Sequence, residues 1–417
     1  MKKCLSCFAI SVFVILPQFM LAQTQLYGVL YDAKTQAPIP FANVFFLSNQ
    51  GRGVISNQNG EFLVKIYEQD RSDQLVISQL GYENYRLSLS TLGSDTLSIQ
   101  MTPSFHALQE ITVISDRGLR GVVREALKRI PQNYGTKKYL LEGFYREYSI
   151  SDSAYAEVIE AFVSIQDGPY IKPKKKSKLF WRSMRRSDDQ RNLPDRLQRA
   201  DQNLLYSFYE RSNPIRRRFF HFVKPGIEGF MDGCHFSNRG EFLEKGDTLI
   251  RIGFVPKWFD RFDEKMKASF GFGELLINKS DYGIIKISRG DSDLSVYNEA
   301  IYEKQGQKYF LSSLQSALAL RYDNETRYYR NARQLHIYQV HPVASKVKKK
   351  GKRLPRYKQL REMKYQYDPS IWEDNPFMVE LPAQEALEAD LSRVKKMEDQ
   401  FRENAKKVKT AEEEGGR

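Results

Sequence analysis

The sequence predicts a mainly β protein with α+β character: a small N-terminal β-sandwich, a larger antiparallel-sheet domain with packed helices, and a charged C-terminal helix. Two observations predict this. Short apolar runs between residues 26 and 115 end in Gly, Pro, Asn or Asp, which is typical of strands joined by tight turns. Beyond residue 135, longer strand-like runs follow one another with local turns between them, which favours an antiparallel meander.

Residues 1–22 are predicted to be a secretory signal peptide. Lys2 and Lys3 precede a short apolar run, and Met20-Leu21-Ala22 ends in the small residue expected at a cleavage site. An uncleaved membrane anchor is the alternative, but the run is short for a membrane span and Pro17 interrupts it. We therefore expect the chain to be exported.

Cysteine and charge content narrow the function further. Cys234 is the one cysteine outside residues 1–22, so no internal disulfide is expected in the mature chain. The formal net charge is +14 at pH 7, and Lys2 and Lys3 contribute two of these charges. Excess positive charge indicates an anionic partner. Export argues against nucleic acid, which leaves an anionic lipid surface, an acidic protein partner, or solubility alone.

Residues 26–115 carry an ordered set of short motifs: Gly28–Asp32, Ala42–Val44, Ser56–Phe62, Gly81-Tyr82 and Leu108–Val113. This succession resembles the carboxypeptidase-regulatory-like domain, the seven-stranded transthyretin-type sandwich of exported envelope proteins of the Bacteroidetes type. Ser56 and Asn57 stand where the family has Thr and Asp. The resemblance implies a spacer or docking module without peptidase machinery.

A linker helix is expected at 116–134, because apolar residues from Leu119 to Ile130 recur at helical spacing and Pro131 can end the helix. The α+β domain is expected at 135–381. We expect a basic insertion at 172–186, a helix at 195–211, and strands at 139–148, 156–165, 233–243, 248–255, 272–278, 282–288, 295–303, 308–320, 333–340 and 364–367.

Four phrases within this region, which begin at Gly143, Ile252, Ser280 and Tyr367, resemble the second region of envelope proteins that carry the regulatory-like domain in front. That resemblance implies a curved antiparallel sheet with helices against it, similar to lipoprotein-carrier folds. No biochemical activity follows from it.

Residues 382–417 are expected to form a charged C-terminal helix and tail. An apolar stripe repeats there at spacings of three and four: Leu387, Leu391, Val394, Met397 and Phe401. The simplest interpretation is a helix that packs on its own domain, and a partner-binding helix is the alternative.

The residues predict no catalytic, metal-binding or cofactor-binding site, and hence not an enzyme. The five histidines are not spaced as metal ligands. Cys234 and His235 are neighbours, but adjacent strand residues point to opposite faces, so we expect Cys234 to be a small buried residue. No nucleophile elbow or phosphate loop is present.

The basic stretches are the main functional candidates. They contain Lys174, Lys175, Lys176, Lys178, Arg185 and Arg186, and then Arg216, Arg217 and Arg218. Phe180, Trp181 and Phe219 lie among them, which suits an interface where phosphate meets acyl chain. The hypothesis is binding to an anionic surface, and solvated loops are the alternative.

Three functions are weighed. The first is a non-catalytic accessory, scaffold or docking protein in the periplasm or at the periplasmic face of the outer membrane, with a protein partner there. The second is a periplasmic binding module for lipid or another hydrophobic ligand, if the large sheet encloses an apolar cavity. The third is a hydrolase, which needs converging acids or a base and nucleophile in a pocket.

Overall fold

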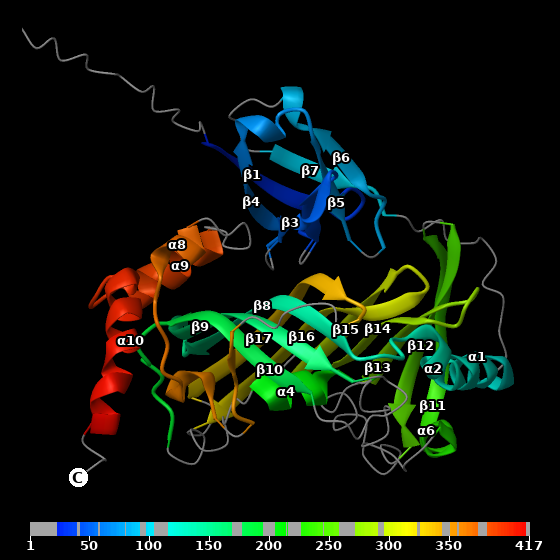
Figure 1. Cartoon of the computed structure of the whole chain (residues 1–417). Helices are drawn as coiled ribbons and strands as arrows, with labels where there is room; N and C mark the ends of the chain where they lie inside the picture. Colours follow the sequence, from blue (N-terminus) through cyan, green and yellow to red (C-terminus); the bar gives the residue numbers. More distant parts are fainter. Residues whose placement is uncertain are drawn as a thin grey trace, which may run out of the picture.

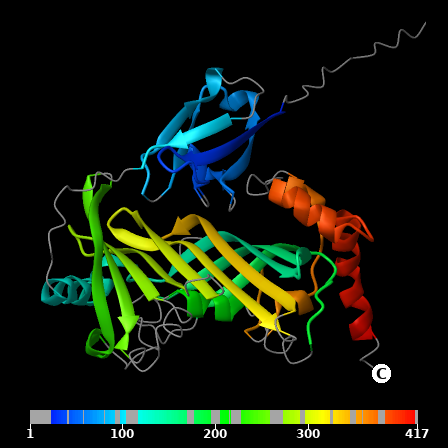
Figure 2. The ribbon, with the colours of Figure 1, turned by 180° about the vertical axis from the view of Figure 1, so that it is seen from behind.

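The computed structural model describes residues 23–39, 42–56, 59–79, 81–91, 97–103, 116–168, 177–194, 205–213, 215, 227–244, 246–257, 272–290, 296–322, 326–343, 351–356, 358–373 and 382–413 (Figures 1 and 2). Within these residues the chain forms two β units, a small sandwich and a large curved sheet. Helices pack against both faces of the large sheet.

The sandwich consists of two small sheets. In the first, β1 (Gln23–Asp32) lies between β4 (Glu61–Tyr67), which is antiparallel to it, and β7 (Leu97–Met101), which is parallel. The second is antiparallel, in the order β3 (Asn49–Ile55), β2 (Asn43–Phe46), β5 (Gln74–Ser78) and β6 (Tyr85–Ser88). The 3₁₀ helices η1 (Glu68–Asp70) and η2 (Leu89–Thr91) lie in the connections. These seven strands confirm the predicted sandwich.

Local sequence accounts for this unit. Strand β4 alternates, so Phe62 and Val64 enter a core that also holds Leu30 and Ile77. The turn before β4 needs glycine at Gly60, where φ is +76° and a Cβ atom would lie 2.4 Å from the carbonyl oxygen of Leu30.

The large sheet has eleven antiparallel strands, and its order is not the order of the chain. From one edge to the other the strands are β11 (Cys234–Glu244), β12 (Asp247–Pro256), β13 (Phe272–Asn278), β14 (Ile284–Gly290), β15 (Val296–Gln305), β16 (Lys308–Tyr322), β17 (Arg327–His341), β8 (Tyr139–Ser151), β9 (Ala154–Asp167), β10 (Lys178–Arg186) and β18 (Lys352–Arg353). Figures 1 and 2 show the curvature of this sheet. The predicted fold class is confirmed.

Register explains where the core lies. One continuous row of paired residues crosses nine strands, and every member belongs to the main apolar core: Ile252, Leu275, Ile287, Ala300, Leu314, Leu335, Tyr145, Ala161 and Met184. Side chains two residues away on each strand share this face. The row therefore fixes which face of each strand meets the helices, and we call it the core face.

The core face is covered by α1 (Asp116–Lys128), α2 (Ile130–Asn133), α4 (Leu205–Ser212) and α6 (Ile227–Gly233), whose apolar residues belong to the same core. The helix expected at 116–134 is thus two helices, and it packs on the large sheet. Pro131 lies in the first turn of α2, where a missing N–H costs no helical hydrogen bond.

Two other sequence predictions differ from the structure, and a third is tested only in part. Residues 178–186, expected in a basic insertion, form strand β10, because their apolar members alternate into the core in spite of the charges. The strand expected at 364–367 is absent; an irregular segment lies there between η5 (Leu360–Glu362) and α8 (Pro369–Glu373). The helix expected at 195–211 is described from Leu205 as α4, and its first part lies outside the described residues.

The C-terminal segment forms two helices, α9 (Pro382–Leu391) and α10 (Met397–Glu413), on the opposite face of β9 and β10. Four members of the predicted stripe pack with Val158: Leu387, Leu391, Met397 and Phe401. The fifth, Val394, is 91% exposed because it lies in the break between the helices. The stripe is therefore a contact with the protein's own sheet.

Candidate functional site

The core face changes abruptly from apolar to polar. The row of paired residues next to the apolar row contains Arg289, Asn298, Ser316, Arg333 and Glu147, on β14, β15, β16, β17 and β8 in that order. We call these five residues the polar row. Each lies two residues from a member of the apolar row, so all five side chains belong to the core face.

At the β8 end, the polar row joins a buried ion network. Glu147 accepts hydrogen bonds from the Tyr145 hydroxyl at 2.8 Å and from Asn331 Nδ2 at 3.0 Å. Arg333 Nε donates to Asn331 Oδ1 at 2.9 Å and lies 3.9 Å from Glu147 Oε1. The Glu147 carboxylate is 2% exposed, so these contacts replace its hydration.

Glu157 is the second carboxylate of the network. Arg361 binds it through two nitrogens, at 3.3 Å and 2.8 Å, and Arg191 Nε lies 3.3 Å away. Arg191 is also paired with Asp189 at 2.6 Å. Burial raises the pKa of Glu157 to about 7 although Arg361 and Arg191 act to lower it. The network attaches two segments without strand structure, 187–194 and 358–365, to the sheet.

A separate ion cluster lies on the opposite face. Glu160 binds Arg146 at 2.5 Å and Arg185 at 2.6 Å. The Arg185 guanidinium also lies over the rings of Trp372, at 4.6 Å, and Phe401, at 4.8 Å. Burial acts to raise the pKa of Glu160, but the two arginines outweigh it and the pKa is lowered. Through Arg185, this cluster connects strand β10 to α8 and α10.

The predicted anionic-surface residues are not brought together as one surface within the described part of the chain. Lys178 is exposed at the start of β10. Arg185 and Arg186 are neighbours on a strand and point to opposite faces: Arg185 binds Glu160, and Arg186 lies 5.7 Å from the centre of the Tyr365 ring on the core face. Six residues lie outside the described residues: Lys174, Lys175, Lys176, Arg216, Arg217 and Arg218.

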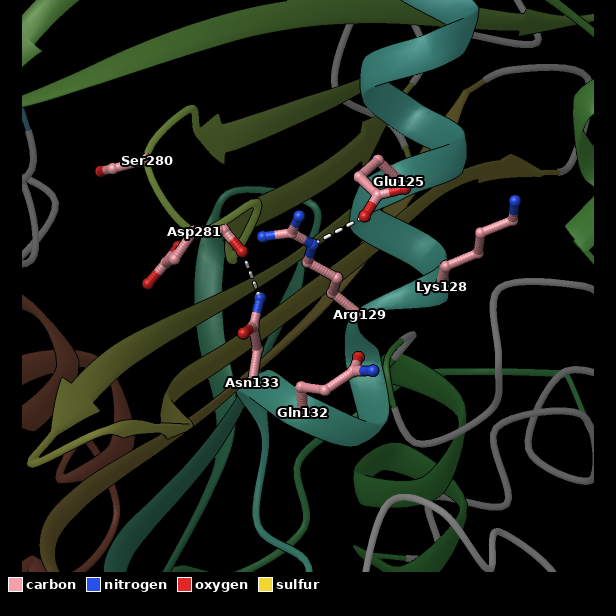
Figure 3. Close-up of a pocket in the computed structure, with 7 residues that line it drawn as sticks. All are labelled: Glu125, Lys128, Arg129, Gln132, Asn133, Ser280 and Asp281. Carbon is pink, nitrogen blue, oxygen red and sulfur yellow. Dashed lines mark hydrogen bonds and ion pairs between the residues drawn. The ribbon is translucent and has the colours of Figure 1, made fainter.

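A surface pocket of about 620 Å³ lies between α1, α2 and the β13–β14 turn (Figure 3). Its lining is polar: Glu125, Lys128, Arg129, Gln132, Asn133, Ser280 and Asp281. Figure 3 shows Arg129 bound to Glu125 and Asn133 Nδ2 donating to the backbone oxygen of Asp281.

The acidic groups of this pocket already have partners. The Asp281 carboxylate binds Lys304 Nζ at 2.7 Å and the Tyr309 hydroxyl at 3.1 Å. Ser280 Oγ donates to Asp247 at 2.8 Å. These contacts tie the β13–β14 turn to neighbouring strands, and the hydrogen bond from Asn133 ties it to α2. We therefore interpret the pocket as a structural junction.

The core face of the sheet is filled by the protein's own side chains where the structure describes it. Tyr134, Tyr139, Tyr145, Tyr209 and Tyr302 are fully buried between the sheet and its helices. The apolar cavity that a hydrophobic-ligand carrier needs is not seen among these residues.

Metal and thiol chemistry find no support in the described ranges. No group of three or more His, Cys, Asp or Glu side chains there could hold a metal ion. Cys234 is buried, and burial raises the pKa of its thiol to about 12, which disfavours the thiolate. His336 is also buried, which lowers its pKa to about 3. No helix in the same ranges is long and apolar enough to cross a membrane.

Sequence reasoning missed the ion networks. The sequence did contain an indication of them. Glu147 lies two residues after Tyr145, and Glu157 lies two residues before Ile159, so each glutamate is on the same face of its strand as a buried apolar residue. Their partners Arg191 and Arg361 come from irregular segments, which carry no periodic signal.

Comparison with known proteins supports the assignment of the first domain. The family model of the CarboxypepD_reg-like domain matches residues 26–113, which span the sandwich, and this match agrees with the resemblance that the motifs carry. No curated protein matches the chain.

Solved structures similar to this chain include three envelope-type proteins. A domain described as an outer membrane lipoprotein-sorting protein from Vibrio parahaemolyticus is 8% identical, covers 52% of this chain and 91% of its own, and has a TM-score of 0.23. A LolA superfamily protein from Nitrosomonas europaea is 12% identical, covers 53% of this chain and 92% of its own, and has a TM-score of 0.22. A chain of the Pseudomonas aeruginosa MucA/MucB complex is 7% identical, covers 53% of this chain and 99% of its own, and has a TM-score of 0.17. These likenesses are too low to carry a function over to this chain.

Proposed function

We propose that this protein is a non-catalytic cell-envelope protein that docks a protein partner at the periplasmic side of the outer membrane. Its sandwich is the docking module, and the large sheet is the body that holds it. The signal-like residues 1–22 and the match to a regulatory-like domain support this compartment and this division of roles.

The observation that carries the proposal is the edge strand β6. Among the described residues, β6 pairs with β5 on one side and stands at the end of its sheet. Tyr85 is 38% exposed, and Arg86 and Ser88 are exposed as well. An edge strand offers unpaired backbone N–H and C=O groups, and an extended segment of a partner can pair with them.

Docking is favoured over carriage of a hydrophobic ligand because the core face is already occupied. The helices and their tyrosines fill the space over the sheet that an acyl chain would need. Catalysis is not part of the proposal, because the described carboxylates of the two ion networks are held by arginines and are mostly withdrawn from water.

The test is affinity purification of the full chain from native membranes after mild crosslinking. A single outer-membrane or periplasmic protein recovered in near-equal amount supports the proposal. Recovery of the chain without a partner, or from the cytosol with residues 1–22 intact, would contradict it.

Binding of the basic residues to an anionic surface stays a separate prediction. In the described part of the chain it rests on Lys178, because Arg185 and Arg186 contact the protein's own residues. Salt-sensitive binding to anionic vesicles, absent with neutral vesicles, is the expected result.

A further inference from the structure

Two basic stretches that are far apart in the sequence meet at one edge of the large sheet. Strand β18 pairs with the start of β10, so Arg353 lies opposite Phe180 and Lys352 lies opposite Trp181. Within the described residues β18 is the last strand of the sheet. Lys178 begins β10 at the same edge. The edge therefore carries cationic side chains from both strands.

These cations lie on both faces of the sheet. Trp181 belongs to the apolar core, so its register partner Lys352 lies on the core face, with Nζ 5.7 Å from the centre of the Trp181 ring. Phe180 is paired with Arg353 and lies two residues from Lys178, so these three side chains share the opposite face. A ligand that meets the sheet edge-on reaches the charges of both faces.

The charges of this edge are exposed. Arg182 adds to them, since it is on the opposite face with its guanidinium 5.4 Å from the centre of the Phe162 ring. On that face the nearest acid by register to Phe180 is Glu142, two strands away on β8, which is 9% exposed and lies 3.9 Å from His341 Nε2. Among the residues that the structure describes, four exposed cations have no ion-pair partner here: Lys178, Arg182, Lys352 and Arg353.

Two features favour a lipid surface over an acidic peptide as the ligand. Strand β18 has only two residues, Lys352 and Arg353, which is too short an edge for an added strand of a partner. Phe180 is half-buried among the cations, and an apolar ring among basic side chains suits the boundary between lipid headgroups and acyl chains. The charges also face in two directions, as contact with a broad anionic surface requires.

We propose that Lys178, Arg182, Lys352 and Arg353 bind the phosphate headgroups of an anionic lipid surface that meets the β10–β18 edge of the large sheet. Basic residues close to such a surface are attracted to it over about one Debye length. This contact is independent of docking through β6, because β6 belongs to the sandwich. Loss of either contact therefore leaves the other intact.

The test measures flotation of the full chain with vesicles made of equal parts of phosphatidylglycerol and phosphatidylcholine. The wild type is expected to bind these vesicles at low salt, to bind less as salt screens the charges, and not to bind phosphatidylcholine alone. The double variant Lys178→Gln, Arg353→Gln is expected to weaken partition onto the vesicles roughly 30-fold, about fivefold for each charge removed.

The matched control is the double variant Lys34→Gln, Lys128→Gln. It removes the same net charge at two exposed lysines that lie elsewhere, on the sandwich and at the end of α1. Its partition should be within about twofold of the wild type. All four substituted residues are exposed, so we expect both variants to unfold at the temperature of the wild type.

Lys352→Gln tests the edge-on contact. Because Lys352 lies on the core face, a ligand on the opposite face alone would not respond to this change, whereas an edge-on surface should bind about fivefold more weakly. Unchanged partition in Lys352→Gln would contradict edge-on contact.

Three results would overturn the proposal as a whole. The first is no binding of the wild type to the anionic vesicles at low salt. The second is equal weakening in the two double variants, which would assign the binding to net charge. The third is binding of polyglutamate, lost in Lys178→Gln, Arg353→Gln, without binding to vesicles, which would assign the edge to an acidic protein.

Discussion

The hydroxyl of Tyr82 donates a hydrogen bond of 2.8 Å to Oδ2 of Asp32, fifty positions earlier in the chain. The other carboxylate oxygen, Oδ1, accepts from the backbone N–H groups of Lys34 and Thr35 at 2.7 and 2.8 Å. Two separate motifs of the sandwich are therefore parts of one contact. Burial acts to raise the pKa of Asp32, but these hydrogen bonds outweigh it, and the pKa lies below its usual value.

Removal of this hydroxyl should weaken the sandwich. Tyr82→Phe is expected to destabilise it by about 1 kcal/mol, because a hydrogen bond to a charged but partly solvated acceptor is lost. Calorimetric unfolding of the full chain measures the effect. Tyr85→Phe, on the exposed strand β6, is the control and should leave the transition unchanged; equal transitions in the two variants would contradict the assigned role.

The Glu160 cluster predicts loss of stability in acid. The pKa of Glu160 is lowered in the folded state. Its contribution to the free energy of unfolding is therefore present above the unfolded-state pKa of about 4.5 and is lost as pH falls through the folded-state pKa. Glu160→Gln leaves Arg146 and Arg185 without their buried acceptor and should cost about 3 kcal/mol at pH 7. Urea unfolding at a series of pH values measures it.

The control for this experiment is Glu228→Gln, which removes the partner of Arg124 at an exposed pair. This substitution should leave the free energy of unfolding nearly unchanged, since solvent screens exposed ion pairs. A Glu160→Gln variant as stable as the control at pH 7 would contradict the account.

Glu157 predicts the opposite pH dependence. The pKa of Glu157 is raised in the folded state. Its contribution to the free energy of unfolding is therefore present below about pH 4.5 and is lost as pH rises through about 7. The groups that act on it are Arg361, Arg191, Asp189 and Glu147.

Glu157→Gln should remove this dependence, so the urea midpoint of the variant relative to wild type should rise between pH 5 and pH 8. A constant difference across that range would show that Glu157 does not titrate there.

The C-terminal helices should depend on Phe401 and not on Val394. Phe401 is 2% exposed and packs with Leu391 and Met397, so Phe401→Ala should cost about 3 kcal/mol and increase hydrogen exchange in α9 and α10. Val394→Ala should change neither quantity, because that side chain is 91% exposed. Similar effects of the two substitutions would contradict the break between the helices.

Local chemistry made the sandwich predictable. Its strands are short and alternating, and turn residues such as Gly60 are needed where φ is positive. The β11–β12 and β13–β14 hairpins were predictable for the same reason, since their partners are neighbours in the chain.

Long-range pairing was not predictable. Strand β17 pairs with β8, so Arg333 lies opposite Glu147 across 186 positions of sequence, and no local pattern states this register. The polar row reaches Glu147 only because of that pairing. The ion network of Glu157 likewise depends on a distant partner, since Arg361 is 204 positions away in the chain. The charge of residues 178–186 led to a wrong prediction. These residues were expected in a basic insertion, but they form a strand whose alternate residues Leu179 and Trp181 are buried.

The most direct test of the docking proposal is site-specific photocrosslinking in the native envelope, with the crosslinking residue at Arg86 on the edge strand β6. The control places it at Gln25, which is exposed but lies on the central strand β1. The account predicts one crosslinked envelope protein from Arg86 and none from Gln25. Absence of a product at Arg86, or equal products at both positions, would contradict it.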